Sequence, residues 1–209
     1  NEIKISNLKI NKNLSKELIK NIKDYLKKSD VKKMPFIKDT FNNIIMSHFF
    51  HELIQFEDKS NFSKTFCQIS AKLKSKGRMI IIDHCDPSND ICQFDMSENK
   101  VLSYKKFKNK FKFYKKDKRE KGNFYNKKNI QNFITKIWSL NTAAEKLEMN
   151  EDHTILNPIK IFKRLKKFGF KLKKIRKFGE LEDLSRFYKL SKKRNKLFER
   201  QFCLVMEKI

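Results

Sequence analysis

The chain has 209 residues, 39% of them hydrophobic, so it can bury one proper core and is too long to be a peptide module. Its formal net charge is +26, with 50 lysines and arginines against 24 acidic residues. No window approaches the roughly 18 uninterrupted apolar residues that a membrane-spanning helix needs, so the sequence predicts no transmembrane segment.

The basic charge has two explanations. Lysines and arginines that neutralise phosphates gain affinity by counterion release, which would favour an RNA partner. Lysine, however, outnumbers arginine 43 to 7. Arginine is the better ligand for phosphates and bases, because its planar guanidinium group can donate two parallel hydrogen bonds. AT-rich codon usage would give the same composition with no nucleic acid involved, so charge alone leaves both explanations open.

The cysteines show no CxxC pair. Cys67, Cys85, Cys92 and Cys203 read best as reduced, unrelated thiols. This predicts a protein of the cytosol or of an organelle matrix. A zinc or iron–sulfur site using Cys85 and Cys92 is the less favoured alternative, since their spacing is not that of a zinc knuckle.

The N-terminal half alternates strands and helices. We predict a strand over 2–10, a helix beginning after Asn13, a short strand over 25–31, and a strand over 43–47 that is covered on both faces. A helix beginning at 62 should follow.

That helix should end at Gly77, a good residue for a helix terminus, before a buried strand over 79–82. Strand, helix and strand with short joints indicate right-handed crossovers in an α/β sheet.

Residues 86–128 have a different character and are interpreted as a basic, aromatic insertion. Between 102 and 128 there are twelve basic residues, two acidic residues and seven aromatic residues. Interleaved rings and lysines suit single-stranded nucleic acid. The favoured alternative is an amphipathic lid, with its rings packed inward and its lysines in water.

Residues 129–209 complete the same domain, while 1–85 form its central part. An apolar stripe predicts a helix over 129–150, with Trp138 in the core. Asn157 should cap a helix that starts with Pro158 and ends at Gly169. Its buried face should comprise Ile159, Ile161, Phe162, Leu165 and Phe168. Strands over 170–178 and 202–206 should close the sheet, with a basic connection between them.

The order of several motifs resembles the class I S-adenosylmethionine-dependent methyltransferases. They are Ser29-Asp30, Met34-Pro35-Phe36, Phe41-Asn42 followed by an apolar run and a serine, and the "LKSKG" segment before "RMIIIDH". The resemblance covers about residues 8 to 84. It implies a Rossmann-like α/β sheet, mostly parallel with an antiparallel last strand, and S-adenosylmethionine as the cofactor.

The resemblance also implies cofactor-binding residues at the carboxyl ends of the strands, where parallel sheets bind ligands. Asp30 would hold the adenine amino group, and the Val31 amide would meet the ring. Asn11 stands where the family has an acid that grips the ribose. Ser47 and His48 would line the methionine side.

The cluster of His48, His51 and Glu52 allows three interpretations. Two histidines on one helix face could bind zinc, but no third ligand is evident, so we predict no metal. His51 or His48 could be a catalytic general base that deprotonates a hydroxyl or amine. The favoured reading is that His51 and Glu52 only anchor the helix.

The family's glycine-rich loop is missing from this sequence. Either the first strand and its loop precede Asn1, so that the chain is N-terminally truncated, or cofactor binding has been lost. The leading hypothesis is a methyltransferase acting on an anionic small molecule, a lipid head group or RNA. The alternative is a catalytically inactive, methyltransferase-like RNA-binding protein, for example a component of a ribonucleoprotein.

Overall fold

The computed structural model describes residues 36–87, 90–179 and 201–209. The strand, helix and short strand predicted over 2–31 lie outside these residues, as does the basic connection within 180–200. Asn11, Asp30 and Val31 therefore have no described position. No helix of the described part is long and apolar enough to cross a membrane.

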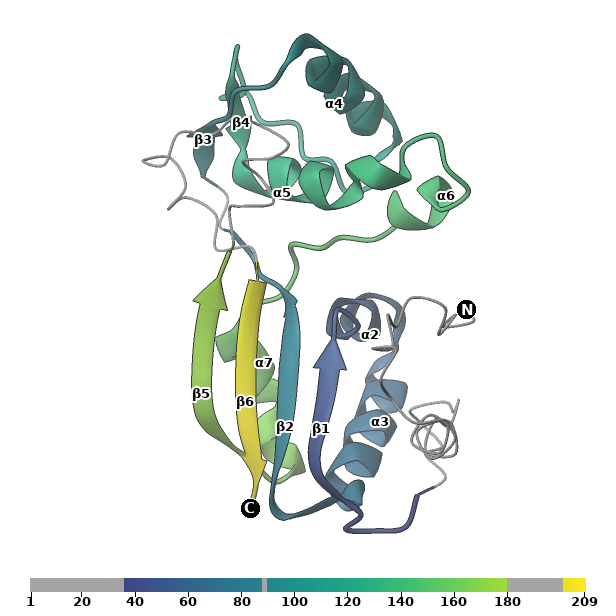
Figure 1. Ribbon diagram of the computed structural model, residues 1–209, viewed down its shortest axis with the longest axis vertical. Helices are drawn as coiled ribbons and strands as arrows, with labels where there is room; N and C mark the ends of the chain where they lie inside the picture. Colours follow the sequence, from purple (N-terminus) through teal and green to yellow (C-terminus); the bar gives the residue numbers. More distant parts are fainter. Residues whose placement is uncertain (1–35, 88–89, 180–200) are drawn as a thin grey trace, which may run out of the picture.

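The described residues form a four-stranded mixed sheet with helices packed against it, and a separate two-stranded sheet (Figure 1). Its elements are β1 (Phe41–Ser47), α2 (Phe50–Phe56), α3 (Lys59–Lys72), β2 (Leu73–His84), α7 (Pro158–Leu165), β5 (Phe170–Phe178) and β6 (Gln201–Lys208). The strand order is β1-β2-β6-β5. β1 and β2 are parallel, and β6 is antiparallel to both β2 and β5.

The antiparallel last strand is confirmed, but the sheet is less parallel in its pairing than expected. β6 inserts between β2 and β5, so two of the three neighbouring pairs among the described strands are antiparallel. β1, β2 and β5 still run in the same direction, and their carboxyl ends meet at one edge (Figure 1).

One face of this sheet carries the main hydrophobic core. Phe62 and Phe66 of α3 lie with Phe168, just after α7, at ring-centroid distances of 6.4 and 5.9 Å, so both helices cover the same face. The prediction that β1 is covered on both faces is wrong for the described part of the chain. Met46 is buried, whereas Ile45 on the opposite side is 62% exposed.

The predicted end of the helix at Gly77 is also wrong. α3 ends at Lys72, and β2 begins at Leu73, whose side chain is fully buried. An extended chain can bury Leu73 without burying the polar residues beside it, because neighbouring side chains of a strand point to opposite faces. A Cβ on Gly77 would lie 2.7 Å from the Lys74 carbonyl oxygen, so the strand itself needs glycine there.

A second hydrophobic cluster lies beyond the carboxyl ends of β1, β2 and β5 (Figure 1). It is built on β3 (Ile91–Gln93), α4 (Glu98–Lys110), β4 (Phe124–Asn126) and α5 (Lys127–Lys136), followed by the 3₁₀ turn η3 (Ile137–Ser139) and α6 (Glu145–Glu148). Its buried members run from Cys92 to Met149 and so extend past residue 128.

Most rings of the basic, aromatic segment point into this second cluster. Tyr104, Phe107, Phe111 and Tyr125 are buried, while Phe124 is 46% exposed. The four buried rings cannot stack on bases. The segment therefore has the inward-packed arrangement of an amphipathic structure, with its lysines in solvent.

Trp138 is 60% exposed, so its predicted place in the core is wrong. α5 ends at Lys136 and tightens into η3, and the change from 3.6 to 3.0 residues per turn rotates the following side chains away from the apolar face. Lys136, fully buried, occupies the interior position instead.

The C-terminal elements follow the prediction closely. The Asn157 side chain accepts hydrogen bonds from the backbone of Ile159 and Lys160, Pro158 opens α7, and Gly169 adopts a left-handed φ of 81° after η4 (Lys166–Phe168). Ile159 itself is 56% exposed, contrary to the predicted buried face. β5 and β6 have the expected places.

Candidate functional site

All four histidines of the chain line one cavity of about 310 Å³. The remaining lining residues are Glu52, Thr135, Trp138, Glu148 and Glu151. His48, His51 and His84 come from the carboxyl ends of β1 and β2 and the start of α2, and His153 comes from the loop after α6. The cavity thus lies between the sheet and the second cluster, at the edge where α/β sheets bind their ligands.

His51 is held by the buried carboxylate of Asp83, the penultimate residue of β2. Its Nδ1–H donates to Asp83 Oδ1 over 2.8 Å, and its backbone N–H donates to Oδ2 over 3.0 Å. The His84 backbone N–H donates to Oδ1 over 2.7 Å. Because the carboxylate can only accept, Nδ1 carries the hydrogen and Nε2 faces the cavity.

The His51–Asp83 pair shifts both pKa values toward the charged forms. Burial lowers the pKa of His51, but the hydrogen bond and the negative charge of Asp83 outweigh burial, so the pKa is raised. Burial likewise raises the pKa of Asp83, and the bond and charge of His51 outweigh it, so that pKa is lowered. The pair resembles the base and its orienting acid in many active sites.

His48 stands at the rim, directly after β1. Its ring nitrogens lie 3.1 Å from Ser47 Oγ and 2.9 Å from Gln201 Nε2, and its backbone N–H donates to the Ile82 carbonyl. Its φ of 49° is in the left-handed region, which is strained for a non-glycine residue. Backbone strain of this kind is concentrated at functional sites.

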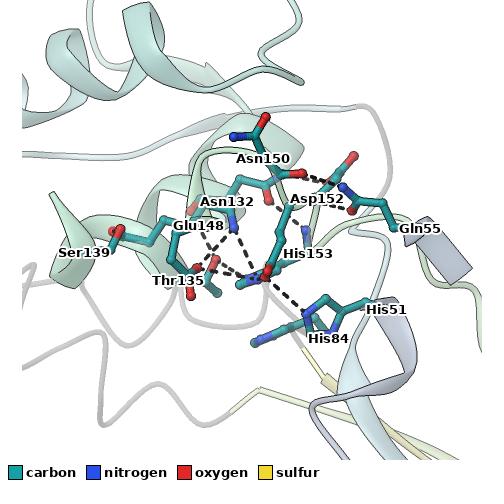
Figure 2. Close-up of polar contacts among 12 residues, drawn as sticks. His51, Gln55, His84, Asn132, Thr135, Ser139, Glu148, Asn150, Asp152 and His153 are labelled. Atoms are coloured by element: carbon teal, nitrogen blue, oxygen red, sulfur yellow. Dashed lines mark hydrogen bonds and ion pairs between the residues drawn. The ribbon is translucent and has the colours of Figure 1, made fainter. Parts of the chain in front are cut away.

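His153 enters from the opposite wall (Figure 2). Lys136 Nζ lies 3.2 Å from its Nε2, and Thr135 Oγ1 lies 2.9 Å from its Nδ1. The ammonium can only donate, so Nε2 accepts and Nδ1–H donates to the threonine. Burial, together with the charge of Lys136, lowers the pKa of His153 to about 2, which makes this imidazole neutral.

The remaining lining groups add carboxylates and one unpaired nitrogen. Burial and the charge of Glu151 raise the pKa of Glu52. His84 stacks on His153 with the rings 4.7 Å apart and 8° from parallel. Its buried Nδ1 has no hydrogen-bond partner within the part of the chain that the structure describes. Burial and the charge of His153 hold the pKa of His84 well below its usual value.

Among the residues predicted from sequence, Ser47, His48 and His51 come together at this edge. The two cysteines of the alternative metal site do not: Cys85 packs in the main core and Cys92 in the second cluster. His153 and Glu151 were not predicted, because a loop between two helices carries no periodic signal. Asp83 and His84 could have been found, since they end a buried strand.

No protein-family model and no curated protein matches the sequence. Several solved structures are similar to this chain at low identity. An S-adenosylmethionine-dependent methyltransferase from Mesorhizobium loti has a TM-score of 0.44 at 11% identity, over 93% of this chain and 78% of that one.

Two further methyltransferases of the same description come from Aquifex aeolicus and Methanosarcina mazei. Their TM-scores are 0.41 and 0.35, at 12% and 13% identity, over 92% and 87% of this chain. The chain spans 62% and 65% of their lengths, which is less than two thirds.

Proposed function

We propose that the chain is a methyltransferase that uses S-adenosylmethionine and binds its methyl acceptor in the histidine-lined cavity. The observation that carries the proposal is the His51–Asp83 pair at the carboxyl ends of a parallel strand pair, with His51 Nε2 facing the cavity. In α/β sheets this edge is the ligand-binding edge.

The cavity lining suits a cationic cofactor. Glu52, Glu148 and Glu151 all contribute to it, and a sulfonium carries a positive charge. Ser47 and His48, at the rim after β1, would hold the methionine side. Asp30 and Val31 would hold the adenine, and Asn11 the ribose. When bound, S-adenosylmethionine supplies an electrophilic methyl group.

The chain's own residues then position and activate the acceptor. Methyl transfer requires the nucleophile to be aligned, and the cavity between the sheet edge and the second cluster places the acceptor beside these residues. His51 is the activating group: with Nδ1–H fixed on Asp83, its Nε2 offers a lone pair to the proton of a hydroxyl or amine acceptor. An anionic acceptor, as a small molecule, a lipid head group or RNA, would have to keep its negative charge outside the cavity, near the lysines of the surface, and bring only its hydroxyl or amine to His51.

The test is calorimetric titration of S-adenosylmethionine into the protein expressed from its complete reading frame. We expect micromolar binding, weakened about tenfold or more in Asp30→Ala, since a hydrogen bond to a charged group is worth about 1.5 kcal/mol or more.

His51→Asn is the matched variant. Its amide nitrogen can still donate to Asp83, while the cavity-facing Nε2 is lost, so cofactor binding should be nearly unchanged. Absence of binding in the folded wild type refutes the proposal and favours the inactive RNA-binding alternative, which rests on the basic charge, on Asn11 and on the missing glycine-rich loop.

A further inference from the structure

We propose that His51, His153 and Glu151 form a binding site for a divalent transition-metal ion of the zinc class. Their ligand atoms all lie within 4.8 Å of one another, and all three residues are buried. Glu151 Oε2 is 3.5 Å from His153 Nε2 and 3.9 Å from His51 Nε2.

These distances are close to those of a real metal centre. In tetrahedral zinc sites the bonds are about 2.0–2.2 Å long, which puts ligand atoms about 3.3–3.5 Å apart. Side-chain rotations that move the ligand atoms by a few tenths of an ångström would bring His51 Nε2 and Glu151 Oε2 to that spacing. The separation of 3.9 Å is too long for a hydrogen bond, so His51 and Glu151 form an ion pair when His51 is protonated but share no hydrogen.

The surroundings of both imidazoles have the form of an outer coordination shell. His51 Nδ1–H donates to Asp83, and His153 Nδ1–H donates to Thr135. Metal-bound histidines almost always donate their second ring N–H in this way, which fixes the tautomer and directs the other nitrogen to the metal. Two histidines with one glutamate are a known catalytic zinc set, in which the fourth position stays open, here to the cavity.

The ammonium group of Lys136 lies beside the nitrogen of His153 that would bind the metal. Its ammonium lies 3.2 Å from His153 Nε2 and 3.3 Å from Glu148 Oε2. For the metal to bind, Lys136 must release His153 and keep only Glu148. Imidazole ligands exclude Mg²⁺ and Ca²⁺, which prefer oxygen, and favour zinc or a similar ion.

The proposal of a metal site can be tested separately from the proposed methyl transfer, because zinc binding is measured without the cofactor or an acceptor. If the proposed function also holds, the ion would take over the activation of the acceptor by lowering the pKa of its hydroxyl group, and His51 would act through the ion.

The experiment is titration of Zn²⁺ into chelator-treated full-length protein in competition with a chromophoric chelator. We expect one ion per chain. His153→Gln and Glu151→Gln should each weaken binding at least about 100-fold, and Thr135→Val about tenfold, as an outer-shell change does. His48→Gln removes a histidine of the same cavity outside the proposed ligand set and should leave affinity unchanged.

Lys136→Met provides a result that misfolding cannot imitate. Removal of the buried ammonium should tighten zinc binding at least about tenfold, because like charges repel strongly at this range. Stoichiometric binding with this pattern supports the site. Zinc affinity that is absent, or equal in wild type and His153→Gln with circular dichroism unchanged, overturns it, whatever the titration with S-adenosylmethionine shows.

Discussion

The carboxylate of Asp83 offers the sharpest test of how the site is held together. It is fully buried and accepts three hydrogen bonds, two from His51 and one from the His84 backbone. In Asp83→Asn the oxygen can keep the two bonds at Oδ1, but the amide nitrogen then faces the His51 backbone N–H. One buried unsatisfied donor costs about 1–3 kcal/mol, and the lost charge-assisted bond adds to it. We expect a loss of about 2–4 kcal/mol.

The assay is urea unfolding followed by circular dichroism, with Asp39→Asn as the control. Asp39 is a mostly exposed partner of Lys208 at 3.0 Å, and its loss should cost less than about 1 kcal/mol. A change below about 0.5 kcal/mol in Asp83→Asn would refute the reasoning, since buried acceptors of charged pairs are not replaceable at so little cost.

The stability difference between the wild type and Asp83→Asn should depend on pH, because folding shifts the pKa values of both Asp83 and His51. Asp83 has a lowered pKa when folded, so its contribution is present above its ordinary value of 3.8 and is lost as pH falls. His51 has a raised pKa, so its contribution is present below its ordinary value of 6.5 and is lost as pH rises. The electrostatic part of the difference in free energy of unfolding between the wild type and Asp83→Asn should therefore be largest between these two pH values and shrink on either side.

Three further outcomes are expected. Asn157→Ala removes the side-chain cap of α7 and should cost about 1 kcal/mol in urea unfolding; an unchanged midpoint would contradict the cap. Gly77→Ala places a methyl group 2.7 Å from the backbone oxygen of Lys74 in the same strand and should cost about 1–3 kcal/mol, whereas a stabilised protein would show that the backbone of β2 can shift there. Burial raises the pKa of Cys92 to about 11, so mass spectrometry after brief alkylation at pH 7.5 should find exposed Cys67 modified and Cys92 intact; equal labelling would refute its burial.

The sequence predicted those parts of the fold that local chemistry controls. Asn157 with Pro158 defined the start of α7, Gly169 the end of the turn η4 that follows it, and the apolar runs located β2 and β6. The prediction failed where long-range packing decides. The burial of Leu73 in a strand depends on segments far away in the chain. Trp138 is a different case, because it turns outward where α5 tightens into η3.

The candidate site shows the same division. His48 and His51 could be placed at a strand end because the resemblance and the strand pattern agree there. His153 could not, since a loop after α6 is brought to His51 only by packing of the second cluster over the sheet edge. The sequence predicted no metal because no third ligand was evident; in the site proposed above, the further ligands would be Glu151 and His153 of this loop.

The basic composition has a further consequence at β5, the outermost strand of the described sheet. An open strand edge can recruit the edge of another molecule, which leads to aggregation, and natural proteins discourage this with lysines. β5 carries Lys171, Lys173, Lys174 and Lys177 along its nine residues, with most of its side chains exposed. Part of the excess of lysine thus acts as a guard against self-association, a role that requires neither RNA nor any other ligand.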